Sequence, residues 1–241
     1  MKDITLPTSV IIDFDNTLYE YSTCHKLAMD SALSFFEEEL NLTNSIVRDS
    51  LDLSRQQVKS SVGSVASSHS RILYAQQSLL NLGFGGKPAL ALQFEQIYWS
   101  RFMEEMKPLE GAVEFLSSLR FKRIPIILLT DLTSQIQIRK LICLGWENLF
   151  DYVITSELVG SEKMSGLPFI YALDLLQDSE KSNVWFIGDQ VFDIPDIESL
   201  KERSLITEGS GYLKGSSDHN RNFVKRFDGF KEFEKVLDLE R

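Results

Sequence analysis

The sequence predicts an α/β fold, a doubly wound parallel Rossmann-like sheet with an inserted all-helical domain. Three short apolar runs, at residues 9–12, 124–129 and 183–187, lack the alternation of half-exposed strands, and polar residues follow each of them. Helical patterns separate the last two runs, and a long segment after the first shows no convincing strand pattern. Alternating buried strands and helices are typical of sheets that bind ligands beyond the carboxyl ends of their strands.

The inserted segment follows the first predicted strand directly. Its apolar residues recur at helical spacing in four stretches, residues 27–40, 46–58, 72–82 and 90–106. A serine-rich stretch at 60–70 interrupts them, and Lys107-Pro108 returns the chain to the α/β pattern. We therefore expect a core formed by residues 1–18 and 108–241 and a helical cap formed by residues 19–107, placed as a lid over the ligand site.

The helices of the predicted core follow the same periodicity. Val113, Leu116 and Leu119 recur at helical spacing after Gly111, and residues 136–144 and 169–176 form two further helical patterns. These helices fill the gaps between buried strands, as a doubly wound sheet requires.

Composition limits the possible partners. The chain has 241 residues, with 25 basic and 35 acidic side chains and a formal net charge of −10. This balance argues against a nucleic acid polymer or an anionic membrane as partner, since both favour a basic surface, whereas a small phosphorylated molecule responds to local charge only. No apolar stretch approaches membrane-spanning length, and two cysteines are too few for a disulfide framework, so we predict a cytoplasmic protein. The oligomeric state is not predicted.

The stretch VIIDFDNTL, residues 10–18, runs from a predicted buried strand into two carboxylates, Asp13 and Asp15. An isolated ionised carboxylate is unfavourable to bury, so the pair needs a cation, a shared proton or strong hydrogen-bond donors. Asp15 lies two residues beyond Asp13, and an extended chain projects both to the same side.

Four separated motifs then coincide on the predicted strand ends. They are the Asp13-Phe14-Asp15-Asn16-Thr17 sequence, Thr130 after the second run, Lys163 ahead of a helix, and Gly188-Asp189 followed by Asp193. With these motifs the sequence resembles the haloacid dehalogenase-like hydrolases, in the branch of Mg²⁺-dependent aspartyl phosphatases whose helical cap follows the first motif. It is similar to the 5′-nucleotidase-like members.

The resemblance implies a reaction in which each motif has a role. Asp13 is expected to be the nucleophile that forms an aspartyl-phosphate, and Asp15 the acid and base that protonates the leaving oxygen and then deprotonates water. Thr130 and Lys163 are expected to bind the phosphoryl group, with Lys163 also orienting Asp13. The expected substrate is a small phosphorylated metabolite, a nucleotide or a sugar phosphate.

The resemblance also implies a Mg²⁺ site. Asp13, the backbone carbonyl of Asp15, and Asp189 are expected to supply oxygen ligands, and Asp193 to complete the set directly or through water. Asp189 and Asp193 could alternatively cap a following helix. Three departures from the family pattern stand out: Asp131 where asparagine is frequent, Met164 where proline is common, and three residues between the two acids rather than the also frequent four.

Other functions remain open at this stage. A dehalogenase does not need Asp15 as an acid, because a halide leaves without a proton, so Asp15 favours phosphate esters. A phosphomutase uses the same aspartates, and a non-catalytic binding or scaffold protein on this fold would be expected to lose them. In the predicted cap, His69 and Arg71 at a helix start are candidates for binding a polar or anionic part of the substrate. The alternative is that Ser70 caps that helix while Arg71 pairs with an acid such as Glu95.

Overall fold

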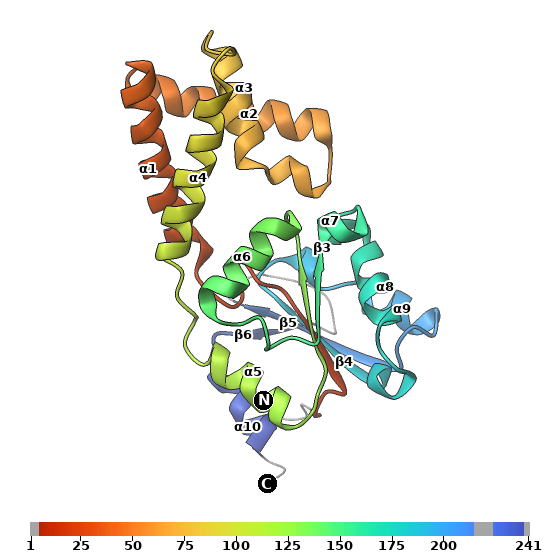
Figure 1. Ribbon diagram of the computed structural model, residues 1–241. Coiled ribbons are helices and arrows are strands. Elements are labelled where there is room, and N and C mark those ends of the chain that lie inside the picture. The colour runs from red at the N-terminus through yellow and green to blue at the C-terminus, as the bar shows by residue number, and fades with distance from the viewer. Residues whose placement is uncertain (1–4, 215–223, 239–241) are drawn as a thin grey trace. The chain divides into compact units, whose positions relative to one another are not determined.

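A computed structural model describes residues 5–214 and 224–238 (Figure 1). The chain forms two compact units. One consists of Met1–Glu20 and Lys107–Arg241, and the other is Tyr21–Met106. We call them the α/β unit and the helical unit.

The α/β unit contains a six-stranded sheet in the order β3-β2-β1-β4-β5-β6. Every neighbouring pair is parallel. The strands are β1 (Ser9–Ile12), β2 (Ile126–Thr130), β3 (Tyr152–Thr155), β4 (Asn183–Gly188), β5 (Glu208–Lys214) and β6 (Val224–Phe227). The predicted α/β fold class is confirmed. The second strand begins two residues later and ends one residue later than predicted, so that Thr130 ends β2 rather than following it.

The three strands with continuous apolar sequences lie at the centre of the sheet. Val10 of β1 is paired with Ile126 of β2 on one side and with Trp185 of β4 on the other. All residues of β1 and β2 are buried. Helices therefore cover both faces of these strands, which explains why their sequences do not alternate.

Helices of the α/β unit pack on opposite faces of the sheet (Figure 1). They are α5 (Ala112–Phe121), α6 (Ser134–Leu144), α7 (Ser156–Val159), α8 (Leu167–Asp174), α9 (Ile197–Glu202) and α10 (Lys231–Asp238). On one face, Phe169 of α8 and Ile197 of α9 belong to the core that includes Phe186. On the other face, Phe233 of α10 lies against Trp185 at 5.5 Å between ring centroids and against Phe115 of α5 at 5.1 Å.

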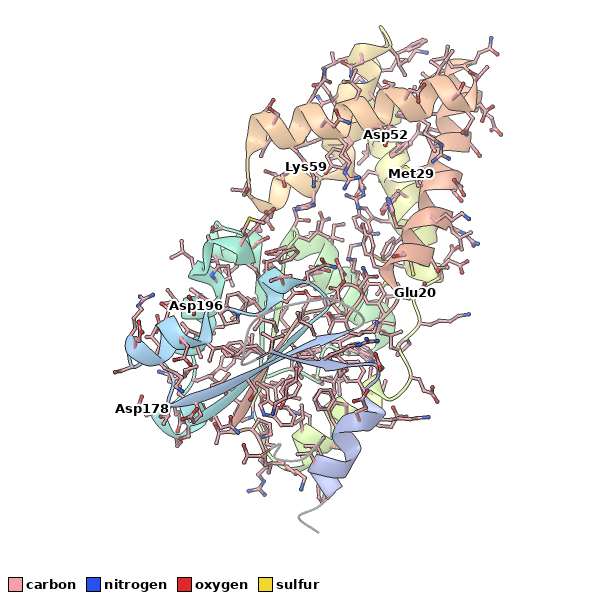
Figure 2. All side chains as sticks on the ribbon, turned by 180° about the vertical axis from the view of Figure 1, so that it is seen from behind. Glu20, Met29, Asp52, Lys59, Asp178 and Asp196 are labelled. Carbon is pink, nitrogen blue, oxygen red and sulfur yellow. The ribbon has the colours of Figure 1, made fainter. Side chains whose placement is uncertain are left out.

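Single turns of 3-10 helix complete this unit: η2 (Lys163–Ser165), η3 (Asp178–Lys181) and η4 (Val191–Asp193). Asp178 and Asp196 lie at the starts of η3 and α9 (Figure 2). The Asp196 side chain accepts a hydrogen bond from the backbone N–H of Ser199 and so caps α9.

The helical unit contains α1 (Tyr21–Leu40), α2 (Asn44–Val62), α3 (Arg71–Asn81) and α4 (Pro88–Glu104), with the turn η1 (Ala66–His69). Helix α1 packs against α4, where the Phe36 and Phe94 rings lie 4.6 Å apart, and α2 packs against α3. The serine-rich stretch is partly helical, because α2 continues to Val62 and η1 follows it. Of the helices in the described residues, none has both the length and the apolar character needed to cross a membrane.

Candidate active site

The candidate site lies at the carboxyl ends of three adjacent strands, β2, β1 and β4. Asp13 follows β1, Thr130 ends β2, and Asp189 follows Gly188 at the end of β4. Because the strands are parallel, these ends share one edge of the sheet, which is where open α/β sheets bind their ligands.

A buried lysine joins two of the predicted acids. The Nζ atom of Lys163 donates to Asp13 Oδ1 at 2.6 Å and also to Asp193 Oδ1. Thr17 Oγ1 donates to the other carboxylate oxygen of Asp13 at 2.8 Å. All four side chains are buried, so each ion pair is shielded from water and its geometry is fixed by the surrounding chain.

The cluster contains more negatively charged groups than positively charged ones. Burial raises the pKa of Asp13 well above its ordinary value, and Asp193 and Asp189 raise it further, whereas Lys163 lowers it. Burial by itself lowers the pKa of Lys163, but Asp13 and Asp193 more than offset this and raise it. Carboxylate oxygens of Asp13, Asp189 and Asp193 all lie within 4.8 Å of one another. Three carboxylates facing one ammonium leave an excess of negative charge that a divalent cation would neutralise.

Asp193 is held by the loop that follows β4. Its Oδ2 atom accepts hydrogen bonds from the backbone N–H groups of Asp189 at 3.1 Å and Gln190 at 2.8 Å. The close approach depends on Gly188, because a Cβ atom at that position would lie 2.1 Å from Asp193 Cβ. Both oxygens of Asp193 therefore already have protein donors, whereas the half-buried Asp189 carboxylate has one described partner, the Gln190 side chain.

The Asp15 carboxylate is not part of the three-acid group and has other partners. Its Oδ1 atom accepts from Lys140 Nζ at 2.9 Å and from the Tyr19 hydroxyl, and its Oδ2 atom lies 3.2 Å from the same Nζ. The cluster of potential metal-ligating side chains does not include it. The expectation that Asp15 contributes its backbone carbonyl to a metal stays a prediction.

Thr130 and Lys163 are each fixed by a residue that the sequence did not single out for this purpose. Gln137 Nε2 donates to Thr130 Oγ1 at 2.6 Å. Asp131 Oδ1 accepts from the backbone N–H of Lys163 at 3.1 Å, and so ties the end of β2 to the turn that carries the lysine. Burial raises the pKa of Asp131. The acid that departs from the family pattern is therefore paired with the lysine-bearing turn.

Sequence reasoning missed Lys140, Gln137 and Tyr19. Both α6 residues lie within the predicted helix at 136–144, and each has no solvent exposure. Their spacing relative to Ile136 and Leu141 places them on the buried face of that helix, which was the available signal.

The two cap candidates lie in the helical unit. Ser70 Oγ accepts from Leu73 N–H and caps α3, as the structural alternative predicted. Arg71 is buried, and its guanidinium donates to the His69 carbonyl at 2.7 Å and to the hydroxyls of Tyr21 and Tyr98. A role for His69 and Arg71 in substrate recognition stays a prediction.

A family match covers residues 8–199 and is to the haloacid dehalogenase-like hydrolases. The chain belongs to this hydrolase family. The ribulose-1,5-bisphosphate 5-phosphatase of Halopiger xanaduensis is 35% identical over 188 residues, which cover 77% of this chain and 78% of that protein. The family match and this relative together show that the chain is a phosphatase.

Solved structures share the fold of this hydrolase. The 2-haloacid dehalogenase of Pseudomonas syringae has a TM-score of 0.70 at 15% identity, with 97% of this chain and 99% of that chain covered. A haloacid dehalogenase-type hydrolase of Bacillus subtilis, solved with bound magnesium, has a TM-score of 0.63 at 18% identity, with 96% and 98% covered. At these identities the likeness extends to the fold alone.

Proposed function

We propose that this hydrolase cleaves small phosphomonoesters in a Mg²⁺-dependent reaction that passes through an aspartyl-phosphate on Asp13. The observation that carries the proposal is the buried contact of Asp13 with Lys163 beside Asp189 and Asp193. It combines a nucleophile, a fixed positive charge and a set of metal-ligating oxygens at one strand edge. In this proposal the helical unit, Tyr21–Met106, acts as the cap that was predicted at residues 19–107, and the α/β unit acts as the core that was predicted at residues 1–18 and 108–241.

The donor set fits Mg²⁺, which prefers carboxylate and carbonyl oxygens and retains several waters. We assign Asp13, Asp189 and the backbone carbonyl of Asp15 as ligands. Asp193 also belongs to the metal site, and because its two oxygens accept from Lys163 and from backbone N–H groups, we assign it to holding the loop and contacting the metal through water. When bound, the ion would offset the charge of the phosphoryl group during attack.

Each side chain of the site has its own step in the proposed reaction. A carboxylate oxygen of Asp13 attacks phosphorus, and the bond to the ester oxygen breaks as Asp15 gives that oxygen a proton. Water then attacks the aspartyl-phosphate and gives a proton back to Asp15, which releases inorganic phosphate and restores Asp13. Lys163 and Thr130 hold the phosphoryl oxygens throughout, where fixed donors stabilise the charge of the transition state.

The proposed substrate class is a phosphorylated sugar or a nucleotide. The relative from Halopiger xanaduensis makes sugar phosphates the first class to examine, with ribulose 1,5-bisphosphate as the first compound.

The test is phosphate release by the purified protein on a panel containing ribulose 1,5-bisphosphate, other sugar phosphates and nucleoside monophosphates, with Mg²⁺ and with EDTA. We expect Mg²⁺-dependent release from at least one compound and no release by Asp13→Asn. Release that persists in EDTA, or that Asp13→Asn retains, would contradict the proposed mechanism.

A further inference from the structure

Helix α6 carries two polar side chains, Gln137 and Lys140, that have no solvent exposure. They are three residues apart, so they lie on the same face of the helix. An amide and an ammonium are unfavourable in a protein interior unless each finds a polar partner. Here the partners are Thr130 and Asp15, two residues to which we assign roles in the reaction.

Lys140 fixes one oxygen of Asp15 more firmly than the other. Oδ1 accepts from Lys140 Nζ at 2.9 Å and from the Tyr19 hydroxyl, whereas Oδ2 has only the longer contact of 3.2 Å with Nζ. The ammonium also lies 5.7 Å from the centre of the Tyr19 ring and 5.9 Å from that of Phe14, so aromatic rings limit its movement. Oδ1 has two donors and Oδ2 has one at a longer distance, so Oδ2 is the oxygen better placed to exchange a proton with substrate.

Gln137 fixes the direction of a hydroxyl. Its Nε2 group donates to Thr130 Oγ1 at 2.6 Å, so that Thr130 is the acceptor in this bond and its own hydroxyl proton stays available. Within the described residues, the buried Oε1 atom of Gln137 has no hydrogen-bond partner. An amide with one unsatisfied atom is a poor choice for stability alone, which favours a role in orienting Thr130.

We propose that Gln137 and Lys140 are positioning residues of the reaction, acting from the buried face of α6. Lys140 anchors Asp15 so that Oδ2 delivers its proton to the departing ester oxygen and takes a proton back from the attacking water. Gln137 directs the Thr130 hydroxyl to donate to a phosphoryl oxygen. This inference rests on the proposed function, and the two residues give different kinetic signatures.

The signature of Lys140 is a dependence on the leaving group. An alkoxide needs a proton as it leaves, whereas p-nitrophenolate leaves readily without one, so loss of a well-placed acid affects an alkyl phosphate most. The value of kcat/KM reports the steps through loss of the leaving group. For Lys140→Met we expect kcat/KM to fall about 10²-fold on glycerol phosphate and less than about tenfold on p-nitrophenyl phosphate.

The matched control is Arg139→Met, which makes the same charge change at the adjacent, partly exposed position of α6. It should leave both values of kcat/KM within about twofold. Tyr19→Phe removes only the second donor to Asp15 Oδ1. It should lower kcat/KM more on glycerol phosphate than on p-nitrophenyl phosphate, as Lys140→Met does. It therefore carries the comparison if Lys140→Met does not fold. If kcat/KM falls equally on the two esters in Lys140→Met, the proposed role of Lys140 is wrong. The same outcome in Tyr19→Phe has this meaning if Lys140→Met does not fold.

The signature of Gln137 is weaker phosphate binding without leaving-group dependence. We expect Gln137→Leu to raise the KM of both esters, and the Kd of inorganic phosphate measured with Mg²⁺, by about tenfold, since one hydrogen bond to a charged group is misdirected. Gln135→Leu makes the same substitution at an exposed position of α6 and should leave these constants unchanged. Identical phosphate binding by the two variants would overturn the role of Gln137.

The wild-type protein separates the two proposals. If it releases no phosphate from either ester with Mg²⁺, the proposed function fails before any variant is compared. If it is active and the α6 variants behave like their controls, only the positioning inference fails.

Discussion

The Gly188→Ala substitution tests whether the loop after β4 must hold Asp193 at close range. A Cβ atom at residue 188 would lie 2.1 Å from Asp193 Cβ and 2.6 Å from Asp193 Cγ, and ordinary van der Waals contact begins at 3.4 Å. The aspartate would therefore have to move by about 1.3 Å. That movement lengthens its contacts with Lys163 and with the backbone N–H groups of Asp189 and Gln190.

The expected effect on stability follows from these contacts. Overpacking costs about 1–3 kcal/mol, and weakened hydrogen bonds to a charged group add to it, so we expect a loss of about 3 kcal/mol in the free energy of unfolding. For a chain of this size this corresponds to a melting temperature lower by roughly 6–12 °C. A misplacement of about 1 Å in the catalytic geometry should also lower kcat about 10²-fold.

The assay compares Gly188→Ala with Gly229→Ala, where an added Cβ meets no atom within 4 Å. Thermal melting and Mg²⁺-dependent phosphate release are measured for both. Wild-type melting and turnover in Gly188→Ala would refute the conclusion that Gly188 is required for the position of Asp193. Equal losses in both variants would show that any added methyl group near the sheet is harmful.

Three further predictions concern the nucleophile, the metal and the helical unit. Asp13→Asn should lower turnover below detection while the protein remains folded by circular dichroism, because the amide is nearly isosteric; substantial activity in the folded variant would rule out Asp13 as nucleophile. Mg²⁺ at about ten times its Kd should raise the free energy of unfolding by about 1.4 kcal/mol, and beryllium fluoride should add to this, whereas Asp189→Asn should respond to neither; an unchanged wild-type melting curve would contradict the metal assignment. Burial, assisted by Arg71 and Arg55, lowers the pKa of His25 to about 4 from 6.5, so the unfolded chain binds the proton first as pH falls. The free energy of unfolding should thus decrease by about 1–2 kcal/mol between about pH 6.5 and pH 4, a value that allows for the partial exposure of the ring. In denaturant titrations, His25→Gln should reduce this dependence of the free energy on pH.

The central strands of the sheet, and the acidic residues that follow them, could be located from the sequence alone. The runs at β1, β2 and β4 are mostly apolar and do not alternate, because both faces of these strands are covered, and burial of this kind is visible in the sequence itself. Strands β3, β5 and β6 were not predicted. Tyr152 in β3 is exposed and Val153 is only partly buried, and β5 contains two glycines, so neither strand is both apolar and buried along its whole length.

These outer strands form because the neighbouring strand offers a row of backbone donors and acceptors, and this depends on the pairing rather than on local composition. Gly211 of β5 shows the point, since a Cβ there would lie 2.5 Å from Ile194 Cγ2. Glycine lowers strand propensity, but Gly211 is required here because Ile194 approaches its backbone closely, and that approach exists only in the folded chain.

The sequence by itself indicated the hydrolase family through its four motifs, located the strands with apolar runs, and supplied the residue types that the chemistry needs, because all of these can be read along the chain. Only the tertiary structure decided the partners of those residues. Lys140 and Asp15 are 125 residues apart in sequence, and Lys163 and Asp13 are 150 apart, yet each pair is in direct contact. Periodicity shows that a side chain is buried, but which charge it meets depends on how distant elements pack, and a buried charge must find its partner there.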